Sequence, residues 1–266
     1  MNFLDVDLPS ELIIFKNNIE TSIKQFVEIK AKAENSLHLW QSKFGGFPYF
    51  PKGMEYPKDV NGQPMYLLAQ INFAEIPSIA KFPTTGILQF YISNSGDVYG
   101  VCFDDLGKQD GFTVLYFPEV SEDESKLVTD FSFLPKPEML PFENSCSLTF
   151  SVKHAPMSVG DYQFESVILG KSIPESKDEL YKVYDIYEDT IQATGHKVGG
   201  YPYFTQSDPR HNKTYKDKKY VLLFQMDTDD EVGIMWGDCG VANFFILEED
   251  LEKKDFSKVL YNWDCC

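Results

Sequence analysis

The apolar residues of this chain fall into short runs separated by Gly, Pro, Asn and Asp, a pattern typical of β-strands joined by tight turns. The runs are rich in aromatic and β-branched residues, which suit a pleated, half-buried surface. Their short connections lack crossover helices and so favour antiparallel pairing. Strands are predicted at 65–73, 86–93, 97–103, 112–117, 145–152, 162–169, 219–227, 232–237 and 241–247.

Three segments have helical spacing instead. Apolar residues between 9 and 34 recur at three- and four-residue steps and predict a first helix. Ser176 and Glu179 form a capping-box pattern that predicts the start of a second helix. A short third helix is expected near 248–262.

The chain also repeats itself, because KFGGFPYF at 43–50 returns as KVGGYPYF at 197–204. Downstream, Leu67, Leu68 and Gln70 match Leu222, Leu223 and Gln225. Paired glycines permit positive φ angles, so each copy of this pattern is interpreted mainly as a turn that begins a strand.

The predicted fold is therefore α+β. It is a mostly antiparallel β-sheet built from two duplicated helix–Gly-Gly loop–strand–hairpin units, with a β-rich insertion between them. The whole chain, 1–266, is interpreted as one domain, because a copy alone would expose aromatic sheet surface. Its predicted parts are unit one at 9–103, the insertion at 104–173, unit two at 174–247, and a C-terminal helix and tail at 248–266.

Charge narrows the class of partner. The chain has 41 acidic and 24 basic residues, a net charge of −17. Such a protein repels phosphate backbones, so nucleic acid is not an expected partner. The acidity either serves solubility or provides an acidic face for a basic protein partner or a metal.

The expected compartment is the cytoplasm. The five cysteines fit no C-x-x-C metal spacing. The first residues lack the basic and apolar regions of a signal peptide, and no apolar run is long enough for a membrane span. Free thiols suit a reducing compartment, and no membrane partner is expected.

Candidate binding residues concentrate in the second copy. Asp208 stands beside Arg210, the single arginine of the chain. Such a pair either fixes its own loop or presents a guanidinium fork to a ligand. A small ligand at the junction of the copies would be lined by Asp208, Arg210, Gln70, Gln225, Trp236, Asp238 and His196.

A weaker alternative is a metal site. Asp227, Asp229, Glu231 and Asp238 imitate ligand positions of a calcium loop. Gly233 is one position too late for that loop and the flanks are predicted strands, so an ordinary acidic turn is favoured. No metal and no cofactor are therefore expected.

The chain resembles the bacterial YwqG-like family over nearly its whole length. The similarity lies in KFGGFPYF (43–50), LAQINF (68–73), GILQF (86–90), FTQSDPR (204–210), IMWGDCGVANFF (234–245) and DFSKVLYNWDCC (255–266). This family is a domain of unknown function. The resemblance implies a bacterial cytoplasmic origin and transfers no catalytic residues.

Three functions follow as hypotheses. The first is a non-enzymatic binding protein of immunity or regulatory type, whose acidic surface meets a basic partner. The second is a small-ligand binder at the repeat junction. The third is a metal-assisted hydrolase using the carboxylates between Asp227 and Asp238. No nucleophile or acid–base pair stands at a recognised spacing, so the sequence favours a protein that is not an enzyme.

Overall fold

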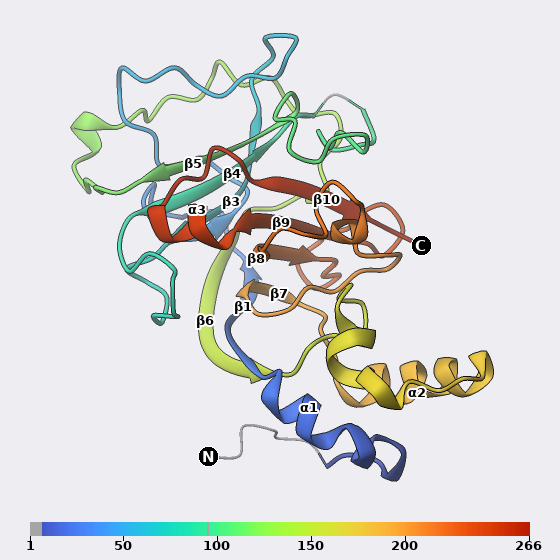
Figure 1. Cartoon of the computed structure of the whole chain (residues 1–266). Coiled ribbons are helices and arrows are strands. Elements are labelled where there is room, and N and C mark those ends of the chain that lie inside the picture. The colour runs from blue at the N-terminus through green and yellow to red at the C-terminus, as the bar shows by residue number, and fades with distance from the viewer. Residues whose placement is uncertain (1–6, 95) are drawn as a thin grey trace.

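The computed structural model describes residues 7–94 and 96–266. Its described part is dominated by one ten-stranded sheet with few helices (Figure 1). The strands are β1 (Lys24–Ala33), β2 (Lys43–Phe44), β3 (Tyr66–Asn72), β4 (Ile87–Ile92), β5 (Phe112–Phe117), β6 (Cys146–Ala155), β7 (His196–Gly199), β8 (Tyr220–Asp227), β9 (Val241–Leu247) and β10 (Leu260–Asp264). The α-helices are α1 (Lys16–Thr21), α2 (Lys177–Thr190) and α3 (Glu248–Lys253). Shorter helical turns lie at Ser10–Phe15, Glu124–Lys126, Glu165–Leu169, Gly170–Ser172 and Pro209–His211.

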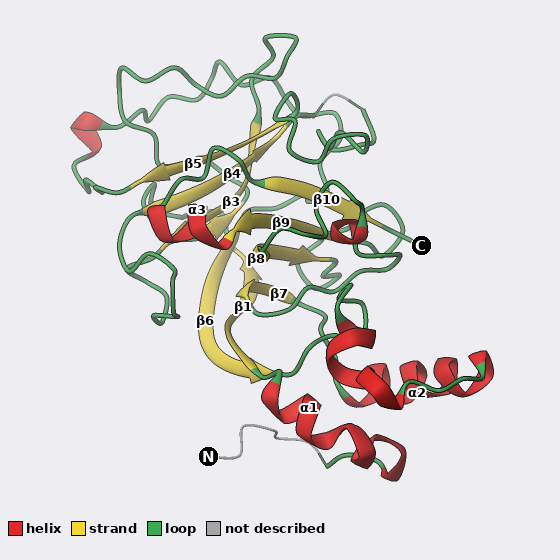
Figure 2. Cartoon of the chain, viewed as in Figure 1, coloured by secondary structure: helices red, strands yellow, loops and turns green. Residues whose placement is uncertain are grey.

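The strand order is β10-β9-β8-β7-β1-β6-β2-β3-β4-β5. Every pairing between these strands is antiparallel, as the short connections predict. The sheet curls into a nearly closed barrel, so that its two ends approach each other (Figure 2). The rings of Phe112 on β5 and Tyr261 on β10 lie 5.2 Å apart, which shows that the first and last strands share one interior.

Aromatic rings fill this interior. Phe90 of β4 stacks on Phe224 of β8 at 4.8 Å and contacts Phe244 of β9 at 4.7 Å. All three side chains are fully buried. Burying one such ring contributes about 1.5–3 kcal/mol, so these contacts bind the two halves of the sheet across the barrel.

The strands lie in mirrored positions about the central pair β1 and β6. Outward from that pair, β7, β8, β9 and β10 follow on one side, and β2, β3, β4 and β5 on the other. The register of β3 shifts between Leu67 and Ala69, and that of β8 shifts between Leu222 and Phe224. Similar local sequences therefore occupy similar places in the two halves.

A smaller apolar cluster joins the helices below the sheet in Figure 1. Ile19 of α1, Tyr187 of α2 and Ile168 of the 165–169 turn are buried in it. The Tyr187 hydroxyl donates to the Met157 carbonyl, directly after β6, at 2.8 Å. The helices are thereby fixed to one end of the sheet. No described helix has the length and apolarity needed to cross a membrane.

The predicted helix over 9–34 is wrong in its second half. Helical structure ends at Thr21, and residues 24–33 form β1. Val27 and Ile29 are buried while their neighbours are more exposed, which is the two-residue period of a strand. Pairing on both edges, with β6 and β7, decides between the two periodicities.

Three predicted strands are also wrong. Residues 97–103 form turns, with Tyr99 at φ +47° and Gly100 at φ +80°. Residues 165–169 form a π-helical turn, and 232–237 form turns in which Gly233 and Gly237 have positive φ. The expected helix at 248–262 ends at Lys253, and β10 follows. These short apolar segments have strand-like patterns, but their backbone turns.

The helix predicted from Ser176 is confirmed as α2, although the Ser176 side chain makes no capping hydrogen bond. The segment 104–173 contains two strands, β5 and β6, and its other residues form loops, turns and short helical segments. The 119–144 stretch is mostly irregular and exposed, but Leu127 and Phe131 are buried against Phe50 and Phe117.

The paired glycines at the start of each repeated sequence adopt the predicted left-handed conformation, with φ +61° and +71° at Gly45 and Gly46, and +75° and +76° at Gly199 and Gly200. We expect Gly200→Ala to lower the free energy of unfolding by about 2–4 kcal/mol, because the added Cβ is strained and overpacked. That Cβ would lie 2.8 Å from the Phe26 Cβ.

Gly62→Ala is the matched control, since Gly62 has φ +77° but open space around it. This substitution introduces backbone strain without a steric clash, and it should lower the free energy of unfolding by about 1 kcal/mol. Urea unfolding of the two variants measures the difference. Equal losses would show that close packing against β1 does not constrain this loop.

Candidate functional site

A cleft of about 720 Å³ opens beside the end of β10. Its walls are residues 103–106, the segment 206–215 and the last residues of β10, 262–264. Three stretches that are distant in sequence therefore meet at one concavity. Asp208 is the one predicted binding residue that lines it.

The lining of this acidic cleft carries four carboxylates, from Asp104, Asp105, Asp208 and Asp264, and no lysine or arginine. Asp104 and Asp105 are exposed, whereas Asp208 and Asp264 are buried. Carboxylates that share a small space repel one another, so a cation is the charge that this cleft favours.

Asp264 holds the rim of the cleft. Its carboxylate accepts hydrogen bonds from the backbone amide and the hydroxyl of Thr205, at 3.3 and 3.2 Å, and from the backbone amide of Gln206 at 3.2 Å. Burial raises the pKa of Asp264 despite these bonds, and the nearby Asp208 charge raises it further. A bound cation would oppose both effects and stabilise the ionised form.

Asn262 supplies a neutral polar group to the same wall. The residue is only 6 % exposed and lies opposite Asn243 of β9. Its side chain forms no hydrogen bond with another described residue, although a buried amide ordinarily has a partner. The Asn262 amide is thus open to a ligand in the cleft.

An aromatic residue flanks the carboxylates. Phe103 is 59 % exposed, and its ring lies 6.3 Å from that of Trp263. The Trp263 indole nitrogen donates to the Val98 carbonyl at 2.8 Å, which fixes that ring. An exposed aromatic face beside carboxylates provides a surface that attracts cations.

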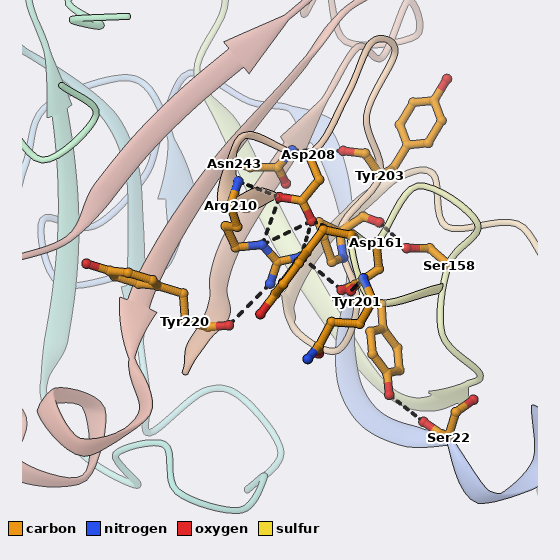
Figure 3. A network of polar contacts seen from close by, with 12 residues as sticks. Ser22, Ser158, Asp161, Tyr201, Tyr203, Asp208, Arg210, Tyr220 and Asn243 are labelled. Carbon is orange, nitrogen blue, oxygen red and sulfur yellow. Dashed lines mark hydrogen bonds and ion pairs between the residues drawn. The ribbon is translucent and has the colours of Figure 1, made fainter. Parts of the chain in front are cut away.

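Behind the cleft, Arg210 forms a buried ion network rather than a binding fork (Figure 3). Its guanidinium donates to Asp208 at 2.6 and 3.0 Å, to Asp161 at 2.9 Å and to the Tyr220 carbonyl at 3.2 Å. It also lies over the Phe245 ring at 4.6 Å. The interpretation of Asp208 and Arg210 as a pair that fixes its own loop agrees with this geometry.

Gln70 and Gln225 are fully buried and are used within the protein. The Gln70 amide donates to the carbonyls of Leu39 and Gln41 and accepts from the Tyr49 amide. The Gln225 amide makes the corresponding bonds to Ala193, Gly195 and Tyr203. Each glutamine joins the loop before a repeated sequence to the strand after it.

The other predicted lining residues are dispersed. Trp236 is fully buried, and its indole nitrogen has no acceptor among the described residues. Asp238 is exposed, and its carbonyl accepts from the Cys266 amide at 3.3 Å. His196 is buried; its Nδ1 accepts from the Asp227 amide at 3.0 Å, and its Nε2 lies 3.4 Å from an Asp229 oxygen. The structure brings none of these three into the acidic cleft.

The carboxylates of the metal alternative have other contacts. Asp227 accepts from the amides of Gly195 and Thr228, at 2.6 and 2.9 Å, while burial raises its pKa. The contact with His196 lowers the pKa of Asp229. Glu231 and Asp238 are exposed. Within residues 7–94 and 96–266, no three His, Cys, Asp or Glu side chains form a group that could hold a metal ion.

The sequence reasoning missed two buried lysines, Lys43 and Lys197, which open the repeated sequences. The Lys43 ammonium donates to the carbonyls of His38, Leu39 and Phe47, at 2.5, 3.3 and 3.0 Å. The Lys197 ammonium donates to the Ala193 carbonyl. Burial lowers the pKa of both lysines to about 8. The sequence does contain a signal for them, because a lysine stands at the first position of both repeated sequences.

Comparison with known families adds one match. A family model described as "Domain of unknown function (DUF1963)" matches residues 42–265, which is most of the chain. No curated protein matches the chain.

Removing the guanidinium tests the buried network. We expect Arg210→Met to lower the free energy of unfolding by about 3–5 kcal/mol, because it leaves two buried carboxylates without their counter-charge. Lys253→Met is the control, because it removes a pair with Glu249 whose side chains are both largely exposed. It should change stability by less than about 0.5 kcal/mol.

Adding Asp161→Asn and Asp208→Asn to Arg210→Met removes the uncompensated charges and should recover part of the loss. Urea unfolding followed by circular dichroism measures all three proteins. An Arg210→Met protein as stable as wild type would show that the network does not hold this wall of the cleft.

Proposed function

The chain belongs to the family described as a domain of unknown function (DUF1963), and we propose that it is a non-enzymatic binding protein whose acidic cleft takes up a cationic segment of a basic protein partner. The observation that carries this proposal is the lining of the cleft. Three aspartates, Asp104, Asp105 and Asp264, lie there with an exposed phenylalanine and an open asparagine amide, and no lysine or arginine lines the cleft. The fourth aspartate, Asp208, is already paired with Arg210 behind the cleft.

Electrostatic attraction favours a cationic ligand both at long distance and within the cleft. The net charge of −17 attracts basic proteins before contact and raises their association rate. Within the cleft, Asp104 and Asp105 are placed to pair with lysine or arginine side chains. Exposed pairs of this kind contribute about 0.2–1 kcal/mol each, so several are needed for useful affinity.

The uncharged groups support recognition of a side chain rather than of a simple ion. The Phe103 ring offers a cation–π contact worth about 0.5–1 kcal/mol at an exposed site. The side-chain carbonyl oxygen of Asn262 can accept a hydrogen bond from an ammonium or guanidinium group. The volume of about 720 Å³ lies within the ordinary range for ligand pockets and has room for more than one side chain.

We also propose that the chain arose by duplication of a five-stranded unit, β1–β5 and β6–β10. The mirrored strand order, the paired register shifts, and the matching bonds of Gln70 and Gln225 support this origin. It differs from the units predicted from the sequence, since β5 and β6 would be the counterparts of β10 and β1 rather than parts of an insertion. The acidic cleft would then belong mainly to the second unit.

The cellular setting is proposed on sequence grounds. The YwqG-like resemblance supports a bacterial cytoplasmic protein of immunity or regulatory type. The five cysteines are free, which agrees with a reducing compartment.

A fluorescent octalysine peptide tests the binding proposal by anisotropy. We expect it to bind the wild-type protein more weakly as salt is raised, and an octaglutamate peptide not to bind. Asp104→Asn with Asp105→Asn should weaken octalysine binding about tenfold, because two ion pairs of up to about 1 kcal/mol are lost.

Glu122→Gln with Glu175→Gln is the matched control, because both residues are exposed, lie outside the cleft, and also remove two negative charges. It should change affinity less than twofold. Asn262→Leu should weaken binding without any change of charge. Equal effects of the two double variants would mean that only net charge is sensed, and the cleft proposal would be rejected.

A further inference from the structure

A second cavity, of about 310 Å³, lies where β1 and β7 meet the segment 192–195. It shares no lining residue with the acidic cleft. Its walls include Phe26, Glu28 and Lys30 from β1, Lys197 from β7, and Tyr201. The proposed function does not use this cavity.

Lys197 is the unusual group in its wall, since a lysine is rarely fully buried unless it is paired. The residue is 4 % exposed. Its Nζ contacts the Ala193 carbonyl and lies 5.3 Å from the centre of the Phe26 ring. Both Ala193 and Phe26 line the cavity, which places the ammonium at the cavity surface.

Lys43 shows what a fully coordinated lysine looks like at the corresponding place. Its ammonium has three carbonyl acceptors, from His38, Leu39 and Phe47. An ammonium has three N–H donors. Lys197 has one acceptor among the described residues, so two of its donors are open.

We propose that this cavity binds a small carboxylate, whose oxygens accept the two open N–H groups of Lys197. The lining favours an anion although the protein as a whole is acidic, because Lys30 and Lys197 outnumber Glu28 there. The Glu28 carboxylate accepts a hydrogen bond from the Ser151 hydroxyl at 3.1 Å and forms an ion pair with the Lys30 ammonium at 3.8 Å.

The neighbouring groups are compatible with an anion. His196 accepts a backbone N–H at Nδ1, which is the neutral form of the ring. The Asp227 carboxylate on β8 does not line the cavity and is occupied by two amides. A cavity of about 310 Å³ has room for roughly ten water-sized groups at about 30 Å³ each, so the ligand is a small acid.

The protonation of Lys197 sets the pH dependence of binding. Burial lowers its pKa to about 8, against the opposing influence of Asp227 and Glu28. The ammonium is therefore lost as the pH rises through about 8, and a carboxylate loses its counter-charge. Burial raises the pKa of Tyr201, which also lines the cavity, above this range, so the tyrosine does not reverse the trend.

Calorimetric titrations with acetate, propionate and benzoate, each paired with its neutral amide at constant ionic strength, test the proposal. We expect at least one acid to bind, with its amide at least tenfold weaker. Its affinity should fall about tenfold per pH unit above pH 8. Glu28→Gln should strengthen binding, because it removes the carboxylate that competes for the lysines.

Lys197→Met should abolish binding, and Lys43→Met is the matched control that should retain it. Circular dichroism checks that each variant folds. If the Lys197→Met variant does not fold, the pH profile of the wild-type protein and the affinity of the Glu28→Gln variant decide whether the proposal holds. Absence of binding by all three acids, equal binding of an acid and its amide, or a flat pH profile would overturn the proposal.

Discussion

The pairing of β1 with β6 is the constraint on which the rest of the structure depends. Ten residues of each strand are in register, from Lys24 opposite Ala155 to Ala33 opposite Cys146. β7 then joins the free edge of β1, and β2 joins the free edge of β6. Each half of the sheet is thus attached through this ladder, and the stacked rings of Phe90, Phe224 and Phe244 hold the halves together inside the barrel.

Buried polar groups keep the loops in place around this frame. Gln70, Gln225 and Lys43 bind loop carbonyls that would otherwise be left without donors in the interior. Arg210 does the same for two carboxylates. Several polar residues that the sequence offers as candidates for ligand binding are therefore structural. The two cavities are lined by side chains with fewer hydrogen bonds inside the protein, such as Asn262 and Lys197.

The sequence predicts the long apolar strands well, because residues such as those of β5 and β9 pair with near neighbours and are bounded by turn residues. It does not predict β1, whose apolar residues fit a helix as well as a strand until β6 and β7 are present. The sequence singles out Asp208 because it stands beside the single arginine, and the structure places this residue in the wall of the cleft. The sequence does not single out Asp104 or Asn262, since only tertiary folding brings them together.

The central position of β1 has a consequence for how the chain is made. The partners of β1 on β6 lie about 110–130 residues later in the sequence, and those on β7 lie later still. During synthesis the first strand therefore waits with both edges unpaired while most of the chain is produced. Long-range pairing of this kind slows folding and leaves strand edges available to other chains.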